Sequence, residues 1–395
     1  MDRKEPQVLI EKITRHEPYQ SLQQRIVEGR FPVDLAEAES SFLSLVVAAL
    51  RKRTKKSFFV VLPSDQEAED FSSDLRFFGV ESRVLPWWKT AAYRPAAVRS
   101  RVFGERASIL ADLARHSDGI VVASHRAFVT PVPPRESFGH NLIQLNRNQG
   151  FQPGAIADRL AAYGYMRVPR VALPGEFAQR GEVLDVFMPG DAQALRIQFN
   201  YDTIEKITRF DVDTQSGHEA VQSCILRPLK EIVWDPSLVE TLRIKGEGFP
   251  GCKGRMEALV EGLTTQNEWK GEEYWYGTAF GTIHSVVEYF DDSVVFFAVN
   301  SERLAAQEES TRKEYAGMYR SALRDAPVPP PEFCVNSYMN ALGSFERVVA
   351  TYALKDEFQS RRLPMGAEPS RSFFGNIKYF REDLANFEKI RTSTF

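Results

Sequence analysis

The sequence predicts an α/β protein in which a parallel-sheet unit contains a small inserted α+β domain and is followed by a further α/β subdomain. Three observations support this class. Short apolar runs alternate with segments of helical spacing, a series of strand-like runs follows Asn141, and proline clusters interrupt the chain at 131–134 and 327–331. Continuous apolar runs are typical of parallel strands buried on both faces, whereas runs joined by short turns are typical of antiparallel strands.

The first unit has the pattern of strand, turn and helix. Ser57–Pro63 is an apolar run, and Asp65–Phe77 places apolar residues at helical spacing, with Ser64 or Asp65 as the helix cap. Further strands are expected at 119–124 and 293–299, and a further helix at 101–115. This alternation predicts a parallel sheet covered by helices on both faces.

The segment from 141 to 213 predicts an antiparallel meander packed on one helix. The helix is expected at 155–163, and strands are expected at 182–187, 195–199 and 204–210. Residues with turn chemistry (Pro, Gly, Asn and Asp) separate these strands. Alternation along 195–199 places the apolar residues on one face and Arg196 and Gln198 on the other, which we expect to face solvent or a partner.

Past Asp213 the chain is expected to rejoin the first unit. The expected elements are a short helix at 255–261 that ends at Gly262, a polar helix at 301–324, a strand at 345–353 and a helix at 379–387. The predicted domains are 1–138 and 214–325 for the parallel-sheet unit, 139–213 for the insert, and 326–395 for the second α/β subdomain and the start of a following domain.

Charge and cysteine content argue against several classes of protein. The 50 basic and 53 acidic residues give a formal net charge of −3, so no global positive field attracts nucleic acid. Three widely spaced cysteines fit a reducing compartment, and His125 and His284 have no partners at metal-ligand spacing. No apolar run has the length of a membrane span. We therefore expect a cytoplasmic protein with no membrane partner and no metal.

A series of short motifs runs along the insert in a fixed order. They are Tyr165-x-Arg-Val, Pro174-Gly-Glu-Phe-Ala-x-Arg-Gly181, Asp185-Val-Phe, Arg196-Ile-x-Phe and Phe210-Asp-Val-Asp-Thr-Gln215. In order and spacing they resemble the UvrB-homology region of the bacterial transcription-repair coupling factor (Mfd) family. Flanking features agree with this resemblance over most of residues 20–380. The resemblance implies a degenerate P-loop, helicase-like parallel sheet that carries the insert.

The resemblance also shows that an ATP site is missing. In UvrB, Gly-x-x-x-x-Gly-Lys-Thr holds the nucleotide phosphates. The matching region, 34–50, has neither glycine nor lysine, and Glu37 and Glu39 would repel phosphate. Val299-Asn300 stands where a helicase has its acidic pair. We expect no catalytic residue and no cofactor in this chain; ATP, magnesium, the DNA-translocating motor and the domain that binds RNA polymerase are expected beyond Phe395.

The partner-binding residues follow from the resemblance, residue by residue. Arg167 and Arg180 match family arginines that meet acidic groups on UvrA. Ala178 stands where UvrB has another arginine and Gln198 where it has a glutamate, so these two contacts are altered; Arg196 lies on the same strand face as Gln198. Arginine suits the role because its planar fork can form two hydrogen bonds to a carboxylate. The expected function is recruitment of UvrA for nucleotide excision repair of lesions that block transcription, with RNA polymerase and double-stranded DNA as partners of domains beyond Phe395.

Other interpretations stay open. Without the resemblance, Arg167 and Arg180 are ordinary exposed residues of a meander. A UvrB-like damage-recognition helicase subunit is one alternative function, and a stand-alone adaptor for a different partner is another. Binding of UvrA and hydrolysis of ATP separate these alternatives.

Overall fold

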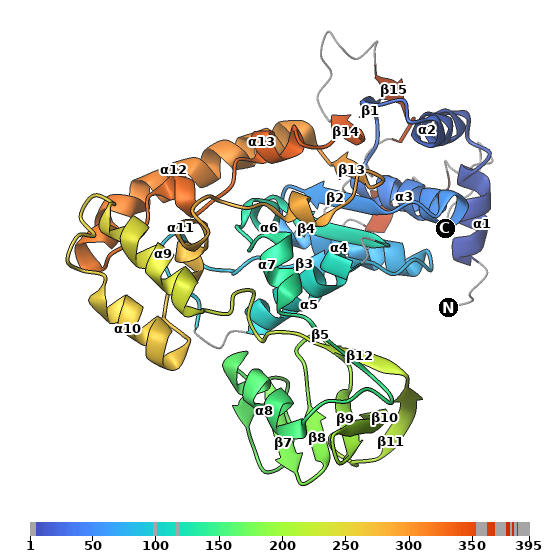
Figure 1. Ribbon diagram of the computed structural model, residues 1–395. Coiled ribbons are helices and arrows are strands. Elements are labelled where there is room, and N and C mark those ends of the chain that lie inside the picture. The colour runs from blue at the N-terminus through green and yellow to red at the C-terminus, as the bar shows by residue number, and fades with distance from the viewer. Residues whose placement is uncertain are drawn as a thin grey trace.

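The computed structural model describes residues 5–97, 101–115, 118–352 and 362–367, together with 377–379, 381, 382 and 385. It contains a parallel sheet, an antiparallel sheet and a helical unit (Figure 1). The predicted α/β class is therefore confirmed. The helix expected at 379–387 lies mostly outside the described residues. In the described ranges, no helix combines the length and the apolar character needed to span a bilayer.

The parallel sheet has seven strands in the order β15-β1-β14-β13-β2-β4-β3. Its strands are β1 (Val33–Ala36), β2 (Phe58–Leu62), β3 (Arg83–Leu85), β4 (Ile120–Ser124), β13 (Val295–Ala298), β14 (Val348–Tyr352) and β15 (Leu363–Pro364). The central strands β2, β4 and β13 are buried along their whole length, as their continuous apolar runs predict.

Helices cover both faces of this sheet (Figure 1). One core packs against α1 (Glu5–Ile13), α2 (Glu17–Glu28), α3 (Ser40–Thr54) and α4 (Asp65–Phe77). The other packs against α5 (Arg101–Arg115), α6 (His125–Val129), α7 (Arg135–His140) and α13 (Tyr338–Leu342). Ser64 caps α4, accepting a hydrogen bond from the Glu67 backbone, as its sequence position predicts.

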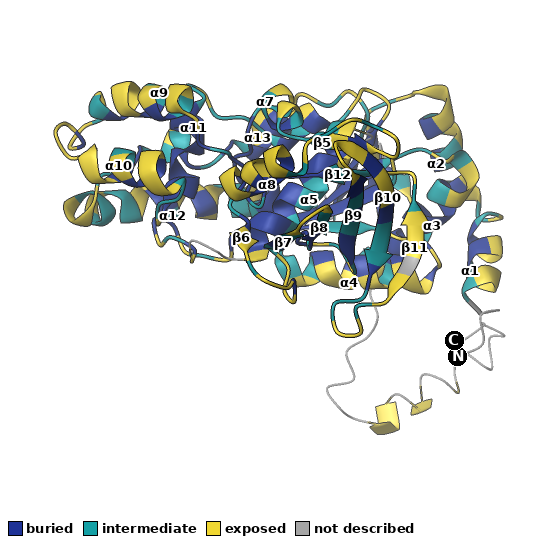
Figure 2. Ribbon diagram, turned by 60° about the horizontal axis from the view of Figure 1, so that its bottom comes forward, coloured by how far each residue is buried: buried dark blue, intermediate teal, exposed yellow. Residues whose placement is uncertain are grey.

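The antiparallel sheet has the strand order β11-β10-β9-β8-β7-β6, in which only β6 and β7 run parallel. Its strands are β6 (Met166–Arg167), β7 (Glu176–Arg180), β8 (Val183–Val186), β9 (Ala194–Asn200), β10 (Thr203–Phe210) and β11 (Gly217–Val221). Helix α8 (Pro153–Ala162) packs on one face. Figure 2 shows β11 as an exposed edge strand. A separate pair, β5 (Ile143–Asn146) with β12 (Ser223–Leu226), joins the two chain ends of this unit.

A third core lies between α9 (Pro236–Glu247), α10 (Glu257–Gln266), α11 (Tyr276–Ala279) and the long helix α12 (Ser301–Asp325). Among the described residues are also the short 3-10 helices η1 (Glu272–Trp275), η2 (Val286–Tyr289) and η3 (Pro331–Phe333). Trp88 and Tyr93, from the loop after β3, are buried in this core. The first half of α12 packs on the parallel sheet and its second half on the helical core, so α12 connects the two (Figure 1).

Buried charges lie where the three parts meet. Arg106 of α5 donates to Glu231 at 2.7 Å, and Lys230 donates to Glu272 at 2.7 Å, with all four residues less than a tenth exposed. Glu273, also buried, accepts a hydrogen bond from the Ala96 backbone at 2.8 Å. Burial raises the pKa of Glu273 from 4.5 to about 7.

The turn after β8 packs directly on α5. Arg227 donates to the Pro189 carbonyl at 2.6 Å and to Asp191 at 2.7 Å, which fixes this turn. A Cβ placed on Gly104 of α5 would lie 2.4 Å from the Pro189 ring. The close approach of the antiparallel unit to α5 therefore requires glycine at this position.

The structure differs from the expected elements in several places, three of which have a clear physical reason. Helix α10 continues through Gly262 to Gln266, and a Cβ at Gly262 would lie 2.5 Å from the Trp269 ring, so this glycine serves close packing and does not end the helix. Strand β1 was not expected, since Asp34 interrupts its short apolar run. The antiparallel pairing continues past Asp213 into β11 and β12. The proposed domain boundaries stay predictions.

Candidate partner-binding site

The strand faces of the antiparallel sheet are as the alternation along 195–199 predicts. Leu195, Ile197 and Phe199 are buried against α8, while Arg196 and Gln198 are partly exposed on the opposite face. Strands β7 and β8 form a hairpin with a two-residue turn in which Gly181 has φ 59°, a conformation that glycine adopts without steric cost. The hairpin places Arg180 at the end of β7, close to the partner strand β8.

Asp185 holds two of the predicted arginines on the face opposite α8. Its carboxylate is almost fully buried and accepts from Arg180 Nη2 at 2.9 Å, from Arg196 Nε at 2.7 Å and from Arg196 Nη2 at 2.9 Å. The two-bond contact with Arg196 is the fork geometry that favours arginine over lysine. Asp185 raises the pKa of Arg196 further, so this guanidinium stays charged.

Besides Asp185, the Arg196 side chain contacts an aromatic ring and a side-chain amide. Its guanidinium lies 4.4 Å from the centre of the Phe210 ring, and its Nη2 donates to Gln215 Oε1 at 3.0 Å. The side chain of Arg196 is 22% exposed and that of Arg180 is 51% exposed. Arg180 is therefore the more accessible of the two charges.

A third arginine joins the same network through a loop. Gln215 Nε2 donates to the Val212 carbonyl at 2.8 Å, and Arg170 Nη2 donates to the Val212 and Asp213 carbonyls at 3.3 Å each. Hydrogen bonds thus run without a gap from Arg180 to Arg170. Arg170 is exposed.

The remaining predicted residues lie elsewhere. Arg167 is exposed on the edge strand β6, in register with Phe177, so alternation places it on the α8 side of the sheet. Ala178, which the resemblance places among the contact residues, is only 1% exposed and packs with Val171 and Phe210, so its side chain is not accessible to a partner in this structure. Gln198 is partly exposed and lines a cavity of about 280 Å³ beside Lys206.

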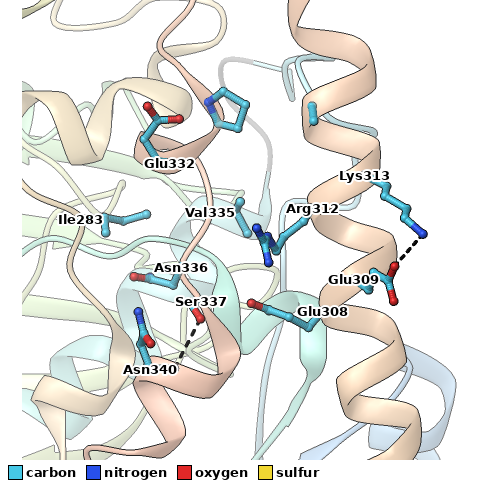
Figure 3. A pocket seen from close by; sticks show the side chains of 12 residues that line it. Ile283, Glu308, Glu309, Arg312, Lys313, Glu332, Val335, Asn336, Ser337 and Asn340 are labelled. Carbon is cyan, nitrogen blue, oxygen red and sulfur yellow. Dashed lines mark hydrogen bonds and ion pairs between the residues drawn. The ribbon is translucent and has the colours of Figure 1, made fainter.

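A separate cavity of about 890 Å³ lies between α12 and residues 331–340 (Figure 3). Lys313 pairs with Glu309 at 2.7 Å, and Glu308 accepts from the Tyr338 backbone at 3.0 Å and lies 3.5 Å from the buried His125. Carboxylates outnumber cations in the lining, which disfavours a polyanionic ligand such as a nucleotide.

The antiparallel unit also matches a known protein family. Residues 143–231 match the family model of the UvrB interaction domain. The transcription-repair-coupling factor of Borreliella burgdorferi is 25% identical over 89% of this chain and 31% of its own length. The corresponding factors of Bacillus subtilis and Escherichia coli are 22% and 23% identical over 95% and 75% of this chain, and 34% and 26% of their own lengths.

The chain is related to transcription-repair-coupling factors. The resemblance that the motifs predict is confirmed by these matches. The chain spans between 26% and 34% of the length of these relatives. All three arginines and Asp185 lie within the range that matches the UvrB interaction domain.

Sequence reasoning missed three members of this hydrogen-bonded cluster, namely Asp185, Gln215 and Arg170. One signal for Asp185 was present. A lone acid among the apolar residues of 183–187 is costly to bury unless a cation reaches it, and arginines stand on both neighbouring strands.

Proposed function

We propose that this chain is a segment of a transcription-repair-coupling factor that recruits UvrA through the exposed arginines of its antiparallel sheet. The observation that carries the proposal is the Arg180–Asp185–Arg196 cluster on the face opposite α8, within the matched UvrB interaction domain. Recruitment would bring the excision-repair machinery to lesions that block transcription.

The geometry supports binding to acidic groups. Arg180 uses one donor on Asp185 and is half exposed, so its other donors are available to a carboxylate from outside. Arg167 adds a separate exposed cation on the edge strand β6, on the α8 side of the sheet. Arginines of this kind are enriched among interface hot spots.

The experiment is a titration of the purified chain with UvrA. We expect Arg167→Ala and Arg180→Ala each to weaken binding by about 5- to 100-fold, corresponding to about 1–3 kcal/mol. Arg159→Ala is the matched control, because it removes one positive charge from α8, on the face opposite Arg180 and on the same side as Arg167. Binding by both variants that equals the control would contradict the assigned residues, and a wild-type chain that does not bind UvrA would favour the adaptor alternative.

We further propose that the parallel sheet is a degenerate P-loop scaffold that binds no nucleotide. The region where UvrB holds phosphate is the turn between β1 and α3. In this chain the Glu39 carboxylate accepts from the backbone amides of Ser41 and Phe42, at 2.8 and 3.4 Å. An anion of the chain itself thus occupies the N-terminus of α3, where a phosphate would need to bind.

The position of the helicase acidic pair supports the same proposal. Asn300 stands after β13 in place of an acidic pair. Its side chain caps α12 by accepting from the Arg303 backbone at 3.3 Å, and its own backbone amide donates to Thr351 at 2.8 Å. These residues do not fit a magnesium-bound nucleotide, because neither a phosphate-binding loop nor a metal-binding carboxylate pair is at hand.

Thermal unfolding with and without Mg²⁺–ATP tests the nucleotide-free scaffold. A ligand that binds the folded state raises the melting temperature, so we expect no shift at millimolar nucleotide. DNA-stimulated ATP hydrolysis by the purified chain would overturn the proposal and restore the helicase alternative. RNA polymerase and double-stranded DNA are proposed partners of the whole protein, through parts beyond these residues.

A further inference from the structure

We infer that Arg170, Arg180 and Arg196 form one binding surface for an acidic protein segment, and that Asp185 positions its arginines. We call these three residues the arginine row. The inference rests on the proposed function, and it adds Arg170 as a contact and Asp185 as a positioning residue.

A continuous hydrogen-bond network links the three arginines of the row. Asp185 joins Arg180 to Arg196, Gln215 joins Arg196 to the Val212 carbonyl, and Arg170 donates to that same carbonyl. Each link comes from a different part of the chain, so the three guanidinium groups have fixed relative positions. Fixed donors lose less conformational entropy on binding than free arginine side chains do.

The loop that carries Gln215 is itself rigidly held. Asp211 Oδ1 accepts from the Thr214 backbone at 2.8 Å and from the Asp213 backbone at 3.1 Å, and the Gln215 backbone donates to the Asp211 carbonyl at 2.8 Å. Gln215 has φ 59°, a conformation that non-glycine residues adopt only when the surroundings compensate. The loop presents the Val212 and Asp213 carbonyls to Arg170.

Charge decides which partner fits. The hydrogen-bonded members of the row are three cations and one buried anion, so the guanidinium groups outnumber the carboxylate that they share. Carboxylates near it, including Asp213 and Glu182, are exposed and would repel the closely spaced phosphates of a nucleic acid duplex. Separate carboxylates on a protein surface can each engage one guanidinium without that repulsion.

The test measures binding of the whole chain to three probes, UvrA, a poly-glutamate peptide and a DNA duplex. We expect Arg170→Ala to weaken binding to UvrA and to the peptide by about 5-fold or more, and Arg170→Glu by more still. Arg159→Ala again supplies the control charge on α8. An Arg170→Ala variant that binds UvrA as tightly as the Arg159→Ala variant would overturn the inference.

A double-mutant cycle tests the positioning role of Asp185. We expect Asp185→Asn to weaken UvrA binding several-fold in the wild-type background and to have little further effect once Arg180 and Arg196 are both alanine. Equal losses in both backgrounds, with unchanged circular dichroism, would show that Asp185 does not act through these arginines.

The three probes separate this inference from the proposed function. If UvrA does not bind but peptide binding depends on Arg170, the proposed function fails and the arginine row stands. If UvrA binds and Arg170→Ala matches the control, the function stands and the row fails. Tighter binding to the duplex than to the peptide, lost in Arg170→Ala, would replace the acidic partner with a nucleic acid and overturn the inference.

Discussion

Asp185 is the residue on which the arginine geometry depends. It is 1% exposed and sits between two strands that each contribute an arginine. A buried carboxylate without partners is strongly disfavoured, so the arginines and the aspartate stabilise one another. The Asp185 carboxylate therefore both orients the arginine side chains and contributes to the stability of the fold.

Replacing Asp185 by alanine should lower the free energy of unfolding by about 2–3 kcal/mol. Arg196, three-quarters covered, then loses both bonds of its fork and keeps only Gln215 and the Phe210 ring. Urea unfolding measures the change. Glu205→Ala, on the exposed part of β10, is the control and should stay within about 0.5 kcal/mol of wild type. A similar loss in both variants would contradict the role given to Asp185.

Helix α5 is the element on which the antiparallel unit rests. Its Gly104 faces the ring of Pro189, and its Arg106 reaches the buried Glu231. Both contacts join segments far apart in the sequence. The local spacing predicts helix α5 itself, but it does not predict these long-range contacts with the antiparallel unit.

Gly104→Ala should destabilise the protein by about 1–3 kcal/mol, because the added Cβ would overlap the Pro189 ring, which cannot move aside as a flexible side chain can. Gly317→Ala is a matched control, since it lies mid-helix in α12 with no atom within 4 Å of the added Cβ. That control should be stabilising by up to about 1 kcal/mol. Thermal and urea unfolding of both variants test this pair, and a neutral Gly104→Ala would show that the contact is loose.

Elements with strong local signals were predictable from the sequence. Helices α4 and α5 begin and end at the expected residues, and β2, β4 and β9 lie within one or two residues of the expected bounds. Local patterns decide such elements because helix spacing, caps and continuous apolar runs act within a few residues. Strands β1, β5, β11 and β12 are short and partly polar, so only their pairing partners make them strands.

In the candidate site, too, some features follow from local sequence patterns and others depend on contacts between distant segments. The face on which Arg196 lies was predictable from alternation, whereas the contact roles of Arg180 and Arg196 stay predictions. The burial of Ala178 and the placement of Arg167 on the α8 side depend on the loop 168–175 and the edge position of β6, which no local pattern indicates. The roles of Asp185 and Arg170 in the cluster depend on contacts between strands and loops that are far apart in the sequence.

The whole molecule is joined by the buried charges between its three parts. Lys230 and Glu231 follow the antiparallel unit, Arg106 belongs to the parallel-sheet unit, and Glu272 and Glu273 belong to the helical core. Burial raises the pKa of Glu231 and of Glu272, and their cationic partners oppose that rise. Glu273 accepts a hydrogen bond from the Ala96 amide at 2.8 Å, and none of the described cations forms an ion pair with it.

Stability should therefore depend on pH through Glu273. The pKa of Glu273 is about 7 in the folded protein, compared with 4.5 for an ordinary glutamate. Between about pH 4.5 and pH 7, Glu273 is therefore protonated in the folded state and ionised in the unfolded state. The contribution of this group is fully present below about pH 4.5 and is lost as pH rises through about 7, by up to about 3 kcal/mol.

Comparison with Glu273→Gln isolates the contribution of Glu273 to the pH dependence of the free energy of unfolding. Glu231 and Glu272 are unchanged in this variant, and the amide oxygen can still accept a hydrogen bond from the Ala96 amide. We expect the free energies of unfolding of the two proteins to be similar near pH 5 and the variant to be the more stable near pH 8. A difference that does not vary with pH would contradict a protonated Glu273.

The pairing of β5 with β12 has a consequence for how the antiparallel unit is built into its host. Ile143 lies opposite Leu226 and Asn146 opposite Ser223, so the chain enters and leaves the unit through neighbouring, hydrogen-bonded strands. A unit whose entry and exit are adjacent can be transplanted into another protein at a single surface loop, because the host needs no rearrangement to accept both ends. The same arrangement defines where to cut: an excised unit needs both β5 and β12, and a piece that stops at Asp213 loses its closing strand.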